Sequence, residues 1–420
     1  MKIAVVGLGY VGLPLARLFS TKYETVGFDI NTSRISELNR GVDSTFEVDG
    51  ELLREAIESK RLSCTDNIDE IRGCNLYVVT VPTPVDNNNT PDLRPLYKAS
   101  EVVGKVISAG DIVIYESTVY PGVTEEECIP VIERISGLTF NVDFFAGYSP
   151  ERINPGDKEH TVEKIKKVTS GSTPEVATIV DNLYNSVLIN GTHKASSIRV
   201  AEASKIIENA QRDVNIAFFN ELAKIFNAMG IDTNDVIEAA ATKWNFIKLK
   251  PGLVGGHCIS VDPYYLIQKA QVYGVMPRIM SEARMLNDGM GEYVATQVIK
   301  EMNKKGVVVK DANILLLGCT FKENCPDIRN TKIIDIYSIL NEYTDNITIY
   351  DPWASAVEVK REYKVDIVKE LQPSVKYDCV ILGVAHKEFA ELDVDSLLAD
   401  SSVIYDVKGF WDLERVDCRL

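Results

Sequence analysis

The chain has 420 residues, of which 45% are hydrophobic and 25% charged, and this composition is typical of a folded protein with two or three domains. Its net charge of -16 argues against nucleic acid as a partner, because phosphate backbones are bound by clustered Lys and Arg. Eight cysteines without CxxC pairs or metal-ligand spacing predict reduced thiols in the cytoplasm and no metal site.

Neither a signal peptide nor a membrane anchor is predicted. Lys2 precedes an apolar run, but glycines and a proline interrupt this run between residues 7 and 14. No uninterrupted apolar stretch reaches the length that a membrane span needs, so we expect no membrane partner.

The first predicted feature is a glycine-rich turn between a strand and a helix. Residues 2–6 predict a buried strand, and Gly7-Leu8-Gly9-Tyr10-Val11-Gly12 then opens a helix that continues through Phe19. In this GxGxxG pattern the first glycine permits a tight turn, the second admits a pyrophosphate, and the third lets helix and strand pack closely. The helix N-terminus adds free N–H groups for the phosphates. We expect a dinucleotide to contact Gly7, Gly9, Tyr10, Val11 and Gly12.

A second predicted strand, residues 25–29, ends in the carboxylate of Asp29, about 20 residues after the glycines. An acid at this position hydrogen-bonds the ribose hydroxyls and repels a 2′-phosphate, which predicts NAD as the cofactor. Arg34 follows closely enough to contact the cofactor, and it leaves NADP open as the alternative.

Three more strands are predicted at residues 76–81, 112–116 and 144–148, separated by helical patterns as in a doubly wound parallel sheet. Ligands of such sheets bind at the carboxyl ends of the strands. The candidates there are Thr83, Thr118 and Glu151. The two threonines are equally typical of turns and helix caps, so Glu151 is the stronger candidate.

One long helix is predicted from residue 199 to residue 228, where apolar side chains recur with a helical period and neither proline nor glycine occurs. Lys205 and Asn209 lie four residues apart and so share one face. They are candidates for ligand binding, and the alternative is an ordinary solvated face. An all-helical segment with spare apolar faces commonly buries them against a second copy of itself, so we expect a homodimer.

After this helix, Gly255-Gly256-His257-Cys258 presents a cysteine on a glycine-hinged loop, with Asp262 four residues later. A thiol acts as a nucleophile when part of it is ionised and a substrate carbon can approach it, so small and polar neighbours suit catalysis. The alternative is a small apolar residue buried on a Gly-rich turn. The dinucleotide-binding pattern at the start of the chain favours the catalytic interpretation.

Strands and helices alternate again after residue 312, which predicts a second Rossmann-like domain. The predicted elements are strands at 314–317, 347–350, 379–384 and 403–407 and a helix at 333–340. The first turn, Gly318-Cys319-Thr320-Phe321-Lys322, lacks the three glycines, so we expect it to bind a different nucleotide. Lys322 and Arg329 would meet a diphosphate and Phe321 would stack on a base, or all three are ordinary surface residues.

Together these motifs resemble the UDP-glucose/GDP-mannose dehydrogenase family over essentially the whole chain. The resemblance rests on the glycine motif, Ser117-Thr118, Ser149-Pro150-Glu151, Lys205 with Asn209, residues 255–258 with Asp262, and Phe321-Lys322 with Arg329. It implies an α/β fold of two Rossmann-like doubly wound parallel-sheet domains, joined by a long central helix and an all-helical dimerisation domain. The implied domains are residues 1–195 for NAD, 196–300 for the helices and the cysteine loop, and 301–420 for a UDP-sugar.

The resemblance also implies the reaction, a four-electron oxidation of the C6 alcohol of a sugar nucleotide to a carboxylate at the expense of two NAD. Cys258 would attack the C6 aldehyde to give a thiohemiacetal, whose oxidation yields a thioester that water cleaves. Lys205 and Asn209 would hold the C6 oxygen, Asp262 and Glu151 would handle protons, and Thr118 would position water. The expected substrate contacts are Glu151, Arg152, Lys205, Asn209, Lys250, Gly255, Cys258, Phe321 and Lys322, and the expected cofactor contacts include Thr83, Thr118 and Arg329.

Some residues of this chain differ from the family pattern, and these differences indicate which substrate it oxidises. In glucose-oxidising members a second glutamate follows Ser-Pro-Glu, and this glutamate is absent from Glu151-Arg152-Ile153-Asn154-Pro155-Gly156. Val261 stands where the family has a lysine just before the aspartate. Residues 152–156, residues 242–246 and His257 are similar to the branch that oxidises UDP-N-acetylhexosamines for capsule or O-antigen uronic acids. Residues 116–122 resemble members acting on UDP-N-acetylglucosamine or UDP-N-acetylgalactosamine, with UDP-N-acetylmannosamine and UDP-glucose as alternatives.

Two other classes of protein remain as alternatives. A two-electron NAD enzyme such as a 3-hydroxyacid dehydrogenase also joins a Rossmann domain to a helical domain, but it needs neither Cys258 nor a second nucleotide fold. A non-catalytic sensor of NAD or of a nucleotide sugar would bind NAD without producing NADH.

Overall fold

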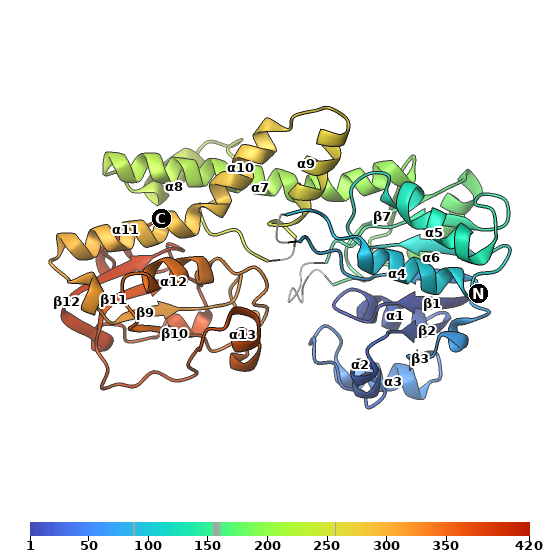
Figure 1. The fold of residues 1–420 in the computed structure, drawn as a ribbon, viewed down its shortest axis with the longest axis horizontal. Helices are drawn as coiled ribbons and strands as arrows, with labels where there is room; N and C mark the ends of the chain where they lie inside the picture. Colours follow the sequence, from blue (N-terminus) through green and yellow to red (C-terminus); the bar gives the residue numbers. More distant parts are fainter. Residues whose placement is uncertain (87–88, 154–158, 160, 257) are drawn as a thin grey trace. The chain divides into compact units, whose positions relative to one another are not determined.

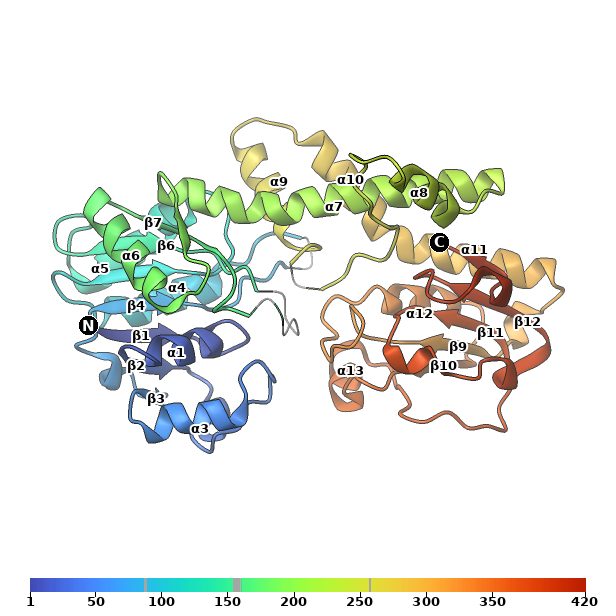
Figure 2. The same cartoon turned by 180° about the vertical axis from the view of Figure 1, so that it is seen from behind.

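The computed structural model consists of two compact units and describes residues 1–86, 89–153, 159, 161–256 and 258–420. The first unit is Met1–Glu208 with Tyr264–Gly274, and the second is Asn209–Pro263 with Val275–Leu420. Figures 1 and 2 show the ribbons of both units from opposite sides. The predicted run Asn154-Pro155-Gly156 and His257 lie outside the described residues.

The first unit is built on an eight-stranded sheet with the order β3-β2-β1-β4-β5-β6-β7-β8. Its strands are β1 (Lys2–Val6), β2 (Glu24–Phe28), β3 (Leu62–Thr65), β4 (Leu76–Val79), β5 (Ile112–Tyr115), β6 (Phe145–Tyr148), β7 (Lys167–Gly171) and β8 (Thr192–Lys194). Neighbouring strands are parallel except β6 and β7, which pair antiparallel. The five predicted strands are therefore confirmed, whereas β3, β7 and β8 were not predicted.

Helices cover both faces of this sheet, because its strands are apolar on both sides. They are α1 (Gly12–Ser20), α2 (Thr32–Leu38), α3 (Gly50–Glu58), α4 (Arg94–Gly104), α5 (Ile129–Ser136) and α6 (Pro174–Val187). Ile3 and Val5 pack with α1 and α6 in one hydrophobic cluster. On the opposite face the buried Tyr115 hydroxyl bonds Ser100 of α4 at 2.6 Å. Figures 1 and 2 show these two layers of helices from opposite sides.

Helix α7 (Ile198–Met229) has 32 residues, so the predicted long central helix is confirmed. Four further helices follow it: α8 (Thr233–Ala241), α9 (Asp262–Val272), α10 (Arg278–Asp288) and α11 (Met290–Lys304). Several apolar side chains of α7 and the segment after it are exposed, among them Phe218, Ile225, Met229 and Trp244. None of the helices in the described residues is both long enough and apolar enough to cross a membrane.

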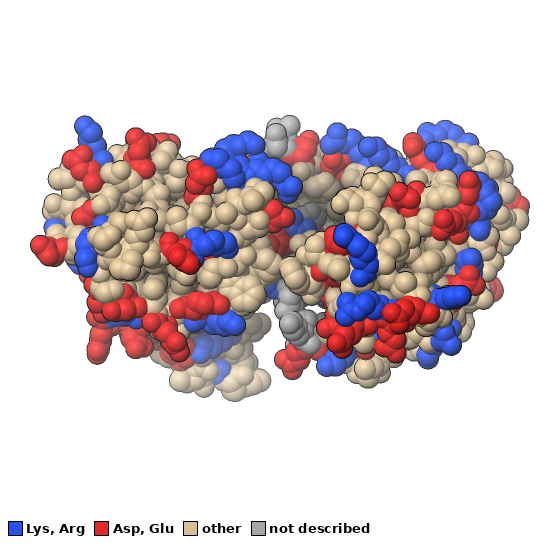
Figure 3. Space-filling view, turned by 90° about the horizontal axis from the view of Figure 1, so that it is seen from below, with Lys and Arg blue, Asp and Glu red and all other residues tan. Residues whose placement is uncertain are grey.

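The second unit is built on a five-stranded, fully parallel sheet with the order β10-β9-β11-β12-β13. Its strands are β9 (Ile314–Leu317), β10 (Ile347–Tyr350), β11 (Tyr377–Leu382), β12 (Leu398–Asp406) and β13 (Cys418–Arg419), with helices α12 (Ile333–Asn341) and α13 (Ala356–Tyr363). Ile314 and Leu316 pack with α11 and α12, whereas Leu315 and Leu317 pack with the short turns around Phe389 and Trp411. The second Rossmann-like sheet is thus confirmed. Figure 3 shows Lys and Arg interspersed with Asp and Glu on the face that it presents.

Candidate active site

The turn after β1 has the geometry of a pyrophosphate cradle. Gly7 has φ +97°, and a Cβ on Gly12 would lie 1.8 Å from the Gly7 carbonyl oxygen, so neither position accepts a side chain without strain. Thr80 Oγ1 supports the turn by donating to the same carbonyl at 2.7 Å. A Cβ on Gly9 would meet nothing within 4 Å, which leaves room for a ligand.

Helix α1 begins at this turn, and its N-cap residue Val11 offers no side-chain cap. The amino ends of α2, α3 and α6 are instead capped by the side chains of Asn31, Asp49 and Thr173. Uncapped N–H groups and the positive end of the helix dipole suit a phosphate. The turn therefore fits the diphosphate of a dinucleotide, as predicted for residues 7–12.

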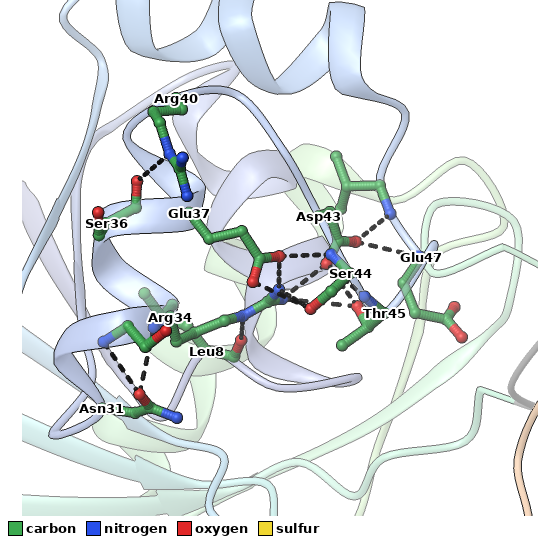
Figure 4. A network of polar contacts seen from close by, with 12 residues as sticks. Leu8, Asn31, Arg34, Ser36, Glu37, Arg40, Asp43, Ser44, Thr45 and Glu47 are labelled. Atoms are coloured by element: carbon green, nitrogen blue, oxygen red, sulfur yellow. Dashed lines mark hydrogen bonds and ion pairs between the residues drawn. The ribbon is translucent and has the colours of Figure 1, made fainter. Parts of the chain in front are cut away.

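Asp29 lies directly after β2 and faces this turn. Its carboxylate accepts hydrogen bonds from the amides of Leu8 and Asn31, both at 2.8 Å. Two such bonds fix the carboxylate while leaving further lone pairs for the hydroxyls of a ribose. Arg34 binds the same residue of the turn, because its Nε donates to the carbonyl of Leu8 at 3.0 Å (Figure 4).

The ends of β4, β5 and β6 bring three predicted residues to one edge of the sheet. Ser117 Oγ donates to the carbonyl of Val81 at 2.6 Å, which ties the segment with Thr118 to the segment with Thr83. The amide of Glu151 donates to the carbonyl of Glu116 at 3.2 Å. Thr83 is buried, while Thr118 and Glu151 are half-buried.

A buried charged cluster supports the Glu151 segment and was not predicted. Lys167 of β7 pairs with Glu116 at 2.6 Å and donates to the carbonyl of Pro150 at 3.2 Å, and Tyr184 of α6 donates to the same carboxylate. Burial raises the pKa of Glu116 although Lys167 acts against it. Lys167 and Glu116 are 51 residues apart, so no local sequence pattern signals the pair.

Arg152, a predicted substrate contact, is held by the protein itself. Its guanidinium pairs with Glu208 of α7 at 2.9 Å and donates to the carbonyl of Lys166 at 2.6 Å. These contacts anchor the segment after β6. A role of Arg152 in substrate binding therefore stays a prediction.

The cysteine loop of the second unit is clamped through its glycines. Asn330 Nδ2 donates to the carbonyl of Gly256 at 2.9 Å, and Gly256 N donates to the carbonyl of Arg329 at 3.2 Å. A Cβ on Gly255 would lie 2.6 Å from the Asn330 carbonyl oxygen, and one on Gly256, at φ +84°, would lie 2.8 Å from the ring of Phe321. The two glycines thus let the loop press against the turn that carries Phe321.

A second clamp holds the same loop at Gly252. Asn220 of α7 donates to the Gly252 carbonyl at 3.0 Å and accepts from the Gly252 amide at 2.8 Å. Asn287 fixes the rotamer of Asn220 by accepting its other N–H at 2.8 Å. Asn220 was not predicted, because its partner lies 32 residues away and the helical pattern identifies only its face.

Cys258 is half-buried at the turn that leads into α9. The amide of Asp262 donates to the Cys258 carbonyl at 2.8 Å, and the Asp262 side chain accepts from Asn209 Nδ2 at 2.5 Å. Lys205 and Asn209 are each only 6% exposed, so the alternative of a solvated face on α7 is wrong. The structure therefore brings together Asn209 and Asp262, two of the predicted site residues.

The first turn of the second sheet repeats the geometry of the first. Gly318 has φ +93°, and Cys319 N donates to Asp351 after β10 as Leu8 N does to Asp29. Asp351, however, is fully buried and also accepts hydrogen bonds from Trp353 N at 2.7 Å and from His386 at 3.2 Å. With its lone pairs used internally, this carboxylate cannot serve a ribose as Asp29 does.

The predicted nucleotide contacts Phe321, Lys322 and Arg329 are all half-buried. Lys322 Nζ lies 5.8 Å from the centre of the Phe321 ring, and Lys250 is exposed. Arg329 forms a two-pronged pair with Asp327, with Nε donating at 2.9 Å and Nη2 at 2.5 Å. The predicted reach of Arg329 to the cofactor stays a prediction.

The sequence matches three family models in chain order. Residues 1–188 match the NAD binding domain of the UDP-glucose/GDP-mannose dehydrogenase family, residues 199–289 its central domain and residues 315–413 its UDP binding domain. The chain belongs to the UDP-glucose/GDP-mannose dehydrogenase family. The predicted family, its NAD cofactor and its enzymatic class are thereby confirmed, which sets aside the hydroxyacid dehydrogenase and the sensor.

Relatives within the UDP-glucose/GDP-mannose dehydrogenase family cover the whole chain. The UDP-N-acetyl-D-glucosamine 6-dehydrogenase of Pseudomonas aeruginosa is 58% identical over 100% of this chain and 99% of its own length. The enzyme of the same name from Salmonella typhi is 54% identical over the same shares. The structure of UDP-D-ManNAc dehydrogenase from Pyrococcus horikoshii matches with a TM-score of 0.91 at 29% identity, covering 100% of this chain and 98% of that chain.

Proposed function

We propose that this dehydrogenase oxidises C6 of UDP-N-acetylglucosamine to the uronic acid with NAD, through a covalent intermediate on Cys258. The relatives at 58% and 54% identity, both named for UDP-N-acetyl-D-glucosamine, support this sugar over its galacto and manno epimers and over UDP-glucose. The activated uronic acid would serve as a precursor of a capsule or O-antigen polysaccharide.

The observation that carries the covalent route is the bonded pair Asn209–Asp262 at the turn of a half-buried cysteine. Asn209 presents its amide from a rigid helix, and Asp262 begins α9 four residues after Cys258. A nucleophile needs such fixed polar neighbours and a side chain that is not fully buried, and Cys258 has both. A purely structural cysteine needs neither.

The residues of this chain divide the chemistry as follows. Bound NAD supplies the hydride acceptor for both oxidations, held by the turn of residues 7–12 and by Asp29. Cys258 adds to the aldehyde carbon and retains it as a thiohemiacetal and then as a thioester. Lys205 and Asn209 stabilise the negative charge that develops on the C6 oxygen.

Two carboxylates handle the proton transfers. Asp262, held by Asn209, takes the proton that leaves the substrate hydroxyl during the first oxidation. Glu151 and Thr118 activate and position the water that cleaves the thioester. The buried Lys167–Glu116 pair fixes the backbone of the Glu151 segment without touching the substrate.

We also propose which domain binds which ligand, how the chain assembles and where the enzyme works. We infer that residues 1–195 hold NAD, residues 196–300 carry the cysteine loop, and residues 301–420 hold the UDP-sugar through Phe321 and Lys322. The exposed Phe218, Ile225 and Trp244 of the helical segment would be buried in a homodimer. Eight free thiols suit a cytoplasmic enzyme.

A panel of UDP-sugars tests the proposed reaction. Each purified UDP-sugar is incubated with excess NAD, and the NADH yield is read by absorbance until the sugar is consumed. UDP-N-acetylglucosamine should give two NADH per molecule and the highest kcat/KM. One NADH per molecule would contradict the covalent route, and a higher kcat/KM with another UDP-sugar would contradict the proposed substrate.

A further inference from the structure

The guanidinium of Arg34 and the carboxylate of Asp29 hold the same residue from two sides. Arg34 Nε donates to the Leu8 carbonyl at 3.0 Å, and Asp29 accepts from the Leu8 amide at 2.8 Å. Arg34 and the carboxylate that suits a ribose thus share one residue of the turn. An arginine close to this position is what NADP-binding Rossmann domains use for the 2′-phosphate.

Every N–H of this guanidinium already has an acceptor. Besides the Leu8 carbonyl, Nη1 donates to Glu37 at 2.8 Å and to Ser44 at 3.3 Å. Nη2 donates to Asp43 at 2.7 Å and to Thr45 at 3.5 Å (Figure 4). Since a guanidinium has five N–H groups, none remains for a phosphate.

We propose that Glu37 and Asp43 set the preference for NAD over NADP, acting as positioning residues that occupy Arg34. The proposal rests on the placement of the adenosine ribose at Asp29. A 2′-phosphate would need donors and positive charge there. It would instead meet an arginine whose N–H groups are all in use. The positive charge of this arginine is outweighed by the carboxylates of Asp29, Glu37 and Asp43.

The two carboxylates are fixed by the segment between α2 and α3. Asp43 accepts from the amides of Thr45 at 3.0 Å, Glu47 at 3.0 Å and Val48 at 2.9 Å, and its side chain is 1% exposed. Glu37 accepts from Ser44 Oγ at 3.0 Å. Burial alone would raise the pKa of Asp43, but hydrogen bonds from Thr45, Val48 and Arg34 outweigh it and lower the net pKa, so the carboxylate stays ionised.

Calorimetric binding of NAD and NADP to the full-length protein, without sugar, tests the proposal. Glu37→Gln and Asp43→Asn each remove one ion pair of Arg34 and one negative charge. We expect the ratio of the NADP Kd to the NAD Kd to fall about tenfold in each variant. Exposed Glu51 of α3 gives the control, because Glu51→Gln removes the same charge without touching Arg34, and its ratio should match the wild type.

Adding Arg34→Leu to Glu37→Gln separates release of Arg34 from simple loss of repulsion, and it should abolish the gain in NADP binding. A gain that persists without Arg34, or an unchanged ratio in folded Glu37→Gln, would overturn the proposal. Asp43 holds three backbone amides whereas Glu37 holds one, that of Ser44, so Glu37→Gln decides if Asp43→Asn does not fold. Binding of NAD is independent of the chemistry at Cys258, so failure of this proposal is distinguishable from failure of the covalent route.

Discussion

Asn209 Nδ2 donates a hydrogen bond to the Asp262 carboxylate at 2.5 Å, so a residue within α7 orients the acid that begins α9. Both side chains are buried, Asn209 at 6% exposure and Asp262 at 3%. This bond holds the carboxylate in one rotamer at the turn that carries Cys258. It makes Asn209 both an expected oxyanion contact and the support of the expected base.

Replacing Asn209 by alanine should therefore reduce kcat by about 100-fold, the typical effect of removing a fixed donor from an active site. The KM for the UDP-sugar should change much less, since Asn209 acts mainly on the developing charge. Steady-state kinetics measures both. Gln211→Ala, at an exposed position of the same helix, should leave kcat unchanged. An effect of Asn209→Ala confined to KM would contradict the role.

The glycines of the cysteine loop give a matched pair of variants. Gly256→Ala places a Cβ at φ +84° and 2.8 Å from the Phe321 ring, so the loop must shift and kcat should fall by about 100-fold or more. Gly252→Ala adds a Cβ that meets nothing within 4 Å, and its kcat should remain within about twofold of the wild type. Equal activity of the two variants would show that the loop geometry does not matter for turnover.

The buried pair Lys167–Glu116 predicts a large effect on stability. Lys167→Met leaves a buried carboxylate without its cation and should lower the free energy of unfolding by about 3–5 kcal/mol. Urea denaturation followed by circular dichroism measures this change. The double variant with Glu116→Gln should recover part of the loss, and Lys194→Met on the exposed β8 should have little effect. A loss below about 1 kcal/mol for Lys167→Met would refute the assignment.

Glu202 of α7 predicts a specific dependence of stability on pH. Its buried carboxylate accepts from the amides of Gly122 at 2.6 Å and Thr124 at 2.9 Å, and burial raises its pKa to about 7 despite these bonds. Between pH 4.5 and about 7 the folded protein keeps a proton that the unfolded chain releases. Stability from this group is therefore present at low pH and lost as the pH rises.

The free energy of unfolding of the wild type should thus fall by about 2–4 kcal/mol more than that of Glu202→Gln between pH 5 and pH 8. Denaturation at several pH values gives the two slopes. Glu221→Gln, at an exposed position of the same helix, should keep the wild-type slope. Identical slopes for Glu202→Gln and the wild type would show that Glu202 does not keep its proton on folding.

Local spacing was enough to predict much of the fold and to select several candidate site residues. Asp29 follows from its distance to the glycine motif, and Lys205 with Asn209 follows from the helical repeat. Apolar runs located the central parallel strands of both sheets, because such strands are buried on both faces. The antiparallel β7 was missed, because Val168 is its only apolar side chain and the strand therefore shows no apolar run.

Contacts between distant residues could not be predicted. Asn220 is 32 residues from Gly252, and Lys167 is 51 from Glu116, so only the folded chain reveals these pairs. The contacts of Arg34 were not predicted either, although most of its partners lie closer in the sequence. The sequence left it open to a 2′-phosphate, whereas the fold supplies acceptors for all five of its donors.

In the proposed reaction, Cys258 carries the sugar between its two oxidations. Enzyme, NAD and UDP-N-acetylglucosamine are mixed, quenched rapidly with acid and analysed by intact-protein mass spectrometry. The variant Glu151→Gln is included, because slower cleavage of the thioester should increase the amount of adduct. We predict a uronyl adduct that maps to Cys258 and is absent from Cys258→Ser. Continued production of two NADH per sugar by Cys258→Ser, or an adduct that maps to another residue, would rule out covalent catalysis by Cys258.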